Sequence, residues 1–158
     1  MDKDDEVARF WQQKEEELGE PVLMKSISHT YLAGAAGATD SFGILYASAS
    51  YLAYEYAEGE RRSLLDVLFT RKREERRART IRLNRTEILG VGLAASALAR
   101  RWLRRGLPPA RLAETIHSLD RPSLLATLAG TSLCVCTAGE LLVCDTPVNR
   151  QWLSLLRA

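Results

Sequence analysis

The order of strand-like and helix-like segments constrains this chain more than any single motif does. Strand-like segments dominate 22–56 and return at 124–144, an arginine-rich helical segment lies between them, and a helix follows at the end. Alternating residues of β-branched and aromatic type are typical of strands that bury one face. A chain of 158 residues is also long enough to bury its own core. The order predicts one α+β domain, 1–158.

The N-terminal half is predicted to hold one amphipathic helix and then several strands. The helix covers 4–18, within an amphipathic segment at 1–20, and Gly19 followed by Pro21 is a common stop signal for a helix. In the strand at 51–57, the side chains at positions 52, 54 and 56 share one face. The other strands are expected at 23–32, 42–47 and 64–70, with a short returning strand around 81–83.

The segment at 94–121 is predicted to be a helical insertion. A helix at 94–105 is rich in alanine, leucine and arginine and ends at Gly106, and a second helix at 109–119 begins at Pro109. The preceding residues 86–93 contain two glycines, each of which weakens a helix by about 1 kcal/mol. Strand and helix therefore both remain open for 86–93.

Two short strands and a helix are expected after the insertion. Strand character at 124–128 is followed by strands at 132–137 and 140–144. Thr146 is a favourable N-cap and Pro147 suits the first helical position, so the last helix is expected from there to about 156. Its apolar side includes Trp152, which we expect to fill the core.

Two segments resemble the pleckstrin-homology superfamily, in particular its GRAM-type branch. The first is the run GILYASASYLAYE at 43–55, and the second is LCVCTAGELLVCD at 133–145 with the helix of Trp152 after it. The resemblance implies a barrel of two near-orthogonal antiparallel sheets, capped at one end by the C-terminal helix. Members of this superfamily bind phosphoinositides, phosphopeptides, proline-rich segments or other proteins. The N-terminal helix and the helical insertion would be additions to that pattern.

The sequence favours a protein that is not an enzyme. His29 and His117 are isolated from residues that would form a catalytic group with them, and no glycine-rich phosphate loop is present. Cys134 and Cys136 lie two residues apart and point to one face of a strand. This spacing differs from the usual Cys-x-x-Cys spacing of zinc ligands, and it suits small residues in the core. With Cys144 they are expected to be free thiols, and we expect no metal and no cofactor.

Two basic segments are the candidate binding residues. The first, 71–79, has six positive and two negative side chains, and the second, 100–111, has five positive and none negative. Arginine beside tryptophan is a composition found at membrane interfaces and in sites for acidic partners. The alternative is that both are solvated charge runs, with the tryptophan in the core. The candidates are Arg71, Lys72, Arg73, Arg100, Arg101, Trp102, Arg104 and Arg105.

Net charge and hydropathy limit the classes of partner and the cellular location that the sequence favours. A formal net charge of +2 and the lack of a readout motif argue against nucleic acid. The longest apolar stretch, at 88–99, is shorter than the about twenty residues that a membrane span needs. The acidic segment at 1–20 does not resemble a secretory signal peptide, so a cytoplasmic protein is expected, with peripheral membrane contact left open.

The hypothesis is thus a binding module that docks on a protein or on an acidic phospholipid surface. The alternative is a self-associating structural subunit, which would bury Phe10 with Trp11, and Trp102 with Leu103, between chains. On helical geometry, Leu98 and Trp102 lie one turn apart with arginines on either side. If this apolar stripe packs on the sheet, the arginines form a rim around it, and if it is exposed it is a membrane anchor.

Overall fold

The computed structural model describes residues 3–34, 39–57, 78–106, 108–117 and 130–158. It confirms an α+β fold. The strands are β1 (Met24–Gly34), β2 (Thr39–Ala47), β3 (Tyr51–Ala57), β4 (Ala78–Asn84), β5 (Ile88–Ala95), β6 (Thr131–Thr137) and β7 (Glu140–Asp145). The helices are α1 (Lys3–Leu18), α3 (Ser96–Arg105), α4 (Pro109–His117) and α6 (Asn149–Arg157), with a 3-10 turn η1 (Arg85–Glu87) before β5. The strands predicted at 64–70 and 124–128 lie outside the described residues.

The seven strands form one antiparallel sheet in the order β4-β3-β2-β1-β7-β6-β5. The long strand β1 joins the two halves, because it pairs with β2 from Met24 to Leu32 and with β7 from His29 to Gly34. The prediction of two separate sheets is therefore corrected to one continuous sheet. Within the described residues the edge strands β4 and β5 do not pair with each other, so the sheet is not closed into a barrel.

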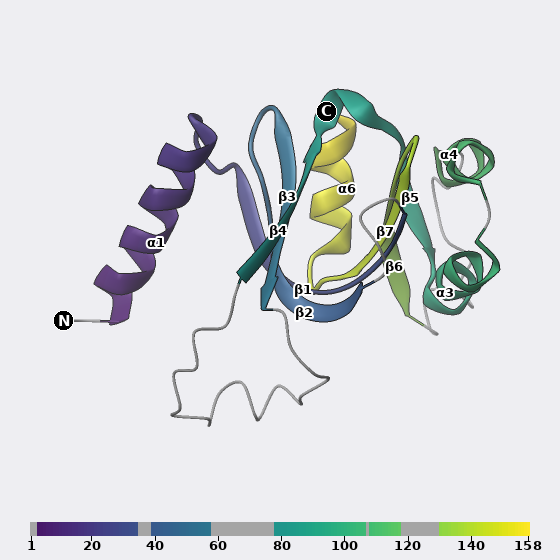
Figure 1. The fold of residues 1–158 in the computed structure, drawn as a ribbon, viewed down its shortest axis with the longest axis horizontal. Helices are drawn as coiled ribbons and strands as arrows, with labels where there is room; N and C mark the ends of the chain where they lie inside the picture. Colours follow the sequence, from purple (N-terminus) through teal and green to yellow (C-terminus); the bar gives the residue numbers. More distant parts are fainter. Residues whose placement is uncertain (1–2, 35–38, 58–77, 107, 118–129) are drawn as a thin grey trace.

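The sheet curves around α6, which lies against its inner face (Figure 1). Trp152 of α6 is fully buried, as predicted, and its indole N–H donates to Ser26 Oγ at 2.8 Å. Leu45, Leu52 and Tyr54 from the first strands and Leu133 and Val135 from β6 belong to the same cluster. Leu52, Tyr54 and Tyr56 share this face, as the alternation of β3 predicted. The inner face is one continuous apolar core.

Helices α3 and α4 cover the outer face of the other end of the sheet, where β5, β6 and β7 lie (Figure 1). Their apolar residues Ala99, Trp102, Leu112 and Ile116 pack on Cys134, Cys136, Leu141 and Val143. Gly90 and Gly92 let α4 approach β5, because a Cβ at Gly92 would overlap the carbonyl oxygen of Ile116. Residues 88–95 thus form the strand β5, and its two glycines make room for α4.

The helix ends follow the sequence closely, with one correction. Gly19 and Gly106 have φ values of 73° and 57°, as expected for glycines that end α1 and α3. The last helix begins at Asn149 rather than at Pro147, so Thr146 is not its N-cap. Thr146 instead closes the preceding turn by accepting the N–H of Val148 at 3.2 Å. Among the helices in the described ranges, none has both the length and the hydrophobicity needed to cross a membrane.

Candidate functional site

Helix α3 presents four arginines to solvent because its other side packs on the sheet. Leu98, Trp102 and Leu103 pack against the outer cluster, and Trp102 is only 8% exposed. The stripe is thus part of the core and the arginines form a rim around it. We name this rim the arginine face, and its residues, all exposed, are Arg100, Arg101, Arg104 and Arg105.

The charges of the arginine face are not neutralised by neighbours in the described part of the chain. None of the four side chains forms an ion pair with a described residue. Arg104 and Arg105 lie in the last turn of α3, where positive charge also favours the helix through its dipole. Of the other predicted binding residues, Trp102 is a core residue, and Arg71, Lys72 and Arg73 lie outside the described residues.

An uncovered band of the outer sheet face lies beside the arginine face. It is made by two neighbouring cross-strand pairs of β1 and β2, which we name the outer strip: Ile27 with Ile44, and His29 with Phe42. Ile27 is 66% exposed and Phe42 is 44% exposed. Large apolar side chains that cluster on a surface mark an interaction site more often than isolated ones do.

The outer strip lies along β1 between the contacts that two helices make with the sheet. At one end, Trp11 of α1 packs edge-on against Tyr46, with ring centroids 5.8 Å apart, and Lys25 lies 4.2 Å over the Trp11 ring. At the other end, the Arg100 guanidinium lies 5.6 Å from the centre of the Tyr31 ring. Lys25 and Tyr31 are six residues apart on one strand, which corresponds to about 20 Å. That span leaves room for about one helix, whose diameter with side chains is about 10 Å.

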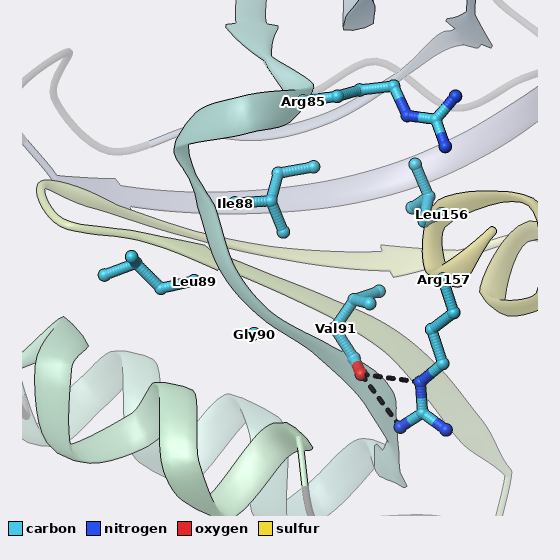
Figure 2. A pocket seen from close by; sticks show the side chains of 7 residues that line it. All are labelled: Arg85, Ile88, Leu89, Gly90, Val91, Leu156 and Arg157. Atoms are coloured by element: carbon cyan, nitrogen blue, oxygen red, sulfur yellow. Dashed lines mark hydrogen bonds between the residues drawn. The ribbon is translucent and has the colours of Figure 1, made fainter. Parts of the chain in front are cut away.

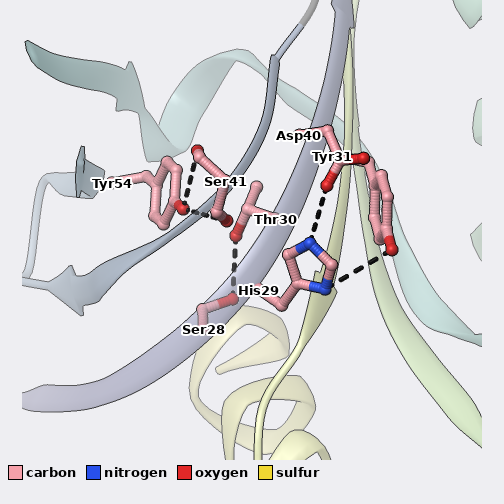
Figure 3. Close-up of polar contacts among 7 residues, drawn as sticks. All are labelled: Ser28, His29, Thr30, Tyr31, Asp40, Ser41 and Tyr54. Carbon is pink, nitrogen blue, oxygen red and sulfur yellow. Dashed lines mark hydrogen bonds and ion pairs between the residues drawn. The ribbon is translucent and has the colours of Figure 1, made fainter. Parts of the chain in front are cut away.

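His29 has contacts on several sides in the outer strip (Figure 3). Its ring stacks on Phe42 with centroids 4.2 Å apart and an interplanar angle of 13°. Its Nε2 lies 2.7 Å from a carboxylate oxygen of Asp40, and its Nδ1 lies 3.4 Å from the Tyr31 hydroxyl. The imidazole is therefore fixed on both edges and on one flat side.

Hydrogen-bond chemistry assigns the direction of one of these bonds. A carboxylate accepts, so Nε2 of His29 donates to Asp40, while Nδ1 faces the Tyr31 hydroxyl. Partial burial raises the pKa of Tyr31, although the nearby Arg100 charge opposes that shift. The phenol therefore stays protonated at neutral pH. The arrangement is a flat platform with polar edges, suited to contact with a partner.

The cluster around His29 was not predicted from the sequence. The alternation of Ile27, His29 and Tyr31 places them on one face of a strand, and that was visible in the residues. Asp40 and Phe42 join them only through the register of β1 with β2, in which His29 pairs with Phe42 and Tyr31 with Asp40. His117, the other histidine, lies at the end of α4.

The cysteines are placed on opposite faces of the sheet. Cys134 and Cys136 share the outer face, as predicted, whereas Cys144 belongs to the inner cluster with Trp152. All three are buried free thiols. Burial raises the pKa of Cys134 well above its ordinary value, that of Cys136 to about 11 and that of Cys144 to about 12. They are protonated core residues, and the sheet separates Cys144 from the other two.

No protein-family model matches this sequence, and no curated protein or solved structure shows significant similarity to it.

Proposed function

We propose that this domain is a non-catalytic binding module on a pleckstrin-homology-like scaffold. The C-terminal helix α6, packed against the inner face of the curved antiparallel sheet, supports the scaffold, because the resemblance implies a capping helix at that place in the chain. The observation that carries the function is the outer strip beside the arginine face. Three buried free thiols are in keeping with a reducing cytoplasmic compartment.

The geometry favours a protein segment over a membrane as the partner. The outer strip lies between the contacts that α1 makes at Lys25 and α3 makes at Tyr31, and a span of this length suits a segment of protein. A single helix would fit the span and contact the apolar side chains. Acidic residues on its α3 side would pair with Arg100 and its neighbours, since opposite charges across an interface favour association and set its orientation.

The test is binding of an acidic amphipathic helical peptide, followed by fluorescence anisotropy. A peptide with the same apolar positions and lysine in place of glutamate serves as the matched probe. We expect the acidic peptide to bind and the basic one not to bind. Replacing Arg100, Arg101, Arg104 and Arg105 with glutamine should weaken binding at least about tenfold, the equivalent of about 1.4 kcal/mol, at nearly unchanged thermal stability.

Two other outcomes decide against a protein segment. Pelleting of the protein with phosphatidylserine vesicles, lost in the glutamine variant, would favour an acidic phospholipid surface instead. If neither probe binds and the glutamine variant behaves like the parent, the arginine face is only a solvated surface. A large loss of stability in the variant would show that the arginines hold the fold together.

Self-association is the second candidate function, and the exposure of Ile27 supports it. The two apolar surfaces that the sequence suggested for self-association make contacts within one chain, since Trp11 contacts Tyr46 and Trp102 packs in the outer cluster. The outer strip is the remaining candidate, and the acidic α1 of a second copy has the charge that suits the arginine face. Light scattering after size-exclusion chromatography tests this, and a monomer at high concentration would exclude it.

A further inference from the structure

His29 lies within the outer strip, where a charge on its ring can act on a bound partner. Its side chain is 25% exposed, and its ring stacks on the more exposed ring of Phe42. Histidine is the side chain whose charge ordinarily changes between pH 5 and 8. A proton on this imidazole is therefore the change of charge that mild acidification can make within the outer strip.

The contacts of the His29 ring suit both of its protonation states (Figure 3). A neutral imidazole has one N–H group, which is on Nε2 when that nitrogen donates to Asp40 at 2.7 Å. Nδ1 is then an acceptor, and the Tyr31 hydroxyl, 3.4 Å away, is the donor that faces it. In the charged imidazole both nitrogens donate, so the Tyr31 oxygen accepts from Nδ1. Protonation thus makes the hydrogen of the Tyr31 hydroxyl available to another acceptor.

Charged groups of both signs surround His29 on the neighbouring elements. Asp40 is on β2, and Asp145 on β7 is a cross-strand partner of His29, so the two side chains leave the same face of the sheet. The Arg100 guanidinium of α3 lies 5.6 Å from the centre of the Tyr31 ring. Burial raises the pKa of Tyr31, so the phenol stays uncharged between pH 5 and 8. When His29 is neutral the two carboxylates outnumber the guanidinium, and a proton on His29 removes this excess of negative charge.

We propose that protonation of His29 strengthens the docking of an acidic helix on the outer strip. The inference rests on the proposed function, because it concerns the regulation of that same surface. Two effects act in the same direction. The added positive charge attracts the carboxylates of the partner, and the Tyr31 hydroxyl can donate to one of them. Binding of the helix in turn favours the protonated ring, because the coupling between two binding events is reciprocal.

The test measures the affinity of the acidic amphipathic peptide by fluorescence anisotropy from pH 8 to pH 5.5, at constant ionic strength. Glutamate side chains ordinarily ionise at about pH 4.3, so the peptide keeps its charge over this range. We expect binding at least about threefold tighter at pH 5.5 than at pH 8. His29→Gln retains an N–H that can donate to Asp40 but gains no proton, so its affinity should not change with pH.

A second variant and a second measurement separate the two effects. Tyr31→Phe keeps the ring and removes the hydroxyl, so it should show a smaller pH dependence that comes from the imidazole charge alone. The His29 ring of the parent protein is also followed by NMR, with and without the peptide. The midpoint of its titration should lie at a higher pH when the peptide is bound. Thermal unfolding at both pH values checks that each variant is folded.

A second surface with arginines serves as an internal control. A cavity of about 410 Å³ between β5 and α6 is lined in part by Arg85 and Arg157, and none of its lining residues belongs to the outer strip (Figure 2). Both arginines donate to backbone carbonyl groups. A peptide attracted by positive charge alone would also shift the backbone amide of Leu89 in this cavity. Docking on the outer strip should shift the amides of Ile27 and His29 instead.

The outcomes distinguish this proposal from the proposed function. Equal affinity at pH 5.5 and pH 8 would overturn the proposal and leave the docking surface intact. The same conclusion follows if His29→Gln keeps the pH dependence of the parent, or if the peptide leaves the titration of His29 unchanged. Absence of binding at every pH, or amide shifts at the cavity in place of the outer strip, would overturn both.

Discussion

The two faces of the sheet are covered in different ways. Among the described residues, the inner face packs on α6 and forms a single cluster from Leu32 of β1 to Val91 of β5. The outer face is covered in two separate places, by α1 near Tyr46 and by α3 with α4 near Cys134. Between these places the outer strip stays open, with Ile27 66% exposed.

The continuous buried face concerns the stability of the fold, whereas the open strip concerns recognition of a partner. A continuous buried face contributes most of the free energy of folding, because that contribution grows with the apolar area removed from water. An open apolar band contributes little to folding and is available to a partner. Substitutions on the two faces should therefore differ in how much they lower the free energy of unfolding.

Truncation of the inner core should have the largest effect. Trp152→Ala removes a fully buried indole and the hydrogen bond to Ser26 Oγ. We expect a loss of about 3–5 kcal/mol in the free energy of unfolding, measured by urea denaturation. A loss below about 1 kcal/mol would contradict the central role of the inner face.

The covered part of the outer face should respond to overpacking. Gly92→Ala forces a Cβ into the backbone of α4 at Ile116, and backbone cannot move aside as a flexible side chain can. We expect a loss of about 1–3 kcal/mol. The control is Gly139→Ala in the turn between β6 and β7, where a Cβ meets nothing within 4 Å. Equal stability of the two variants would mean that α4 does not pack tightly on β5.

The pH dependence of stability that the buried thiols cause tests whether both covered faces of the sheet exclude water. The pKa is about 11 for Cys136 on the outer face and about 12 for Cys144 on the inner face. In the unfolded chain a thiol ionises near pH 8.5. The stabilisation from each thiol is thus complete below about pH 8.5 and is lost as pH rises toward the folded pKa.

By pH 10 the expected loss is about 1–2 kcal/mol for each thiol. Urea denaturation at pH 7 to 10 measures it. Cys136→Ala and Cys144→Ala should each make the decline shallower. A decline that is unchanged in Cys136→Ala would show that water reaches the outer cluster.

The open strip should give the smallest effect on stability. Ile27→Thr keeps a β-branched side chain on the strand and exchanges an exposed apolar group for a polar one. We expect a change within about 0.5 kcal/mol, by thermal unfolding, together with weaker binding of the acidic peptide. A large loss of stability would mean that this strip is covered in the folded protein and is not a docking surface.

Several local features could be predicted because short-range chemistry decides them. Gly19 and Gly106 end their helices in the left-handed region, and α1 was expected at 4–18. The shared faces of β3 and of Cys134 with Cys136 follow from the alternation of a strand. The start of α6 was missed by about two residues, because Thr146 bonds within the turn before the helix.

The sequence by itself determined which residues are apolar on each element, and from that pattern Trp152 was expected in the core, whereas burial of the stripe of α3 was left open. Only the tertiary structure decided which elements share a face. The register of β1 with β2 brings Asp40 and Phe42 to His29, and β1 joins both halves into one sheet. The carbonyl groups that hold Arg85 lie in the turn after β2 and in α6, far apart along the chain. Such contacts depend on strand pairing and helix packing between distant segments, which local residue patterns do not encode.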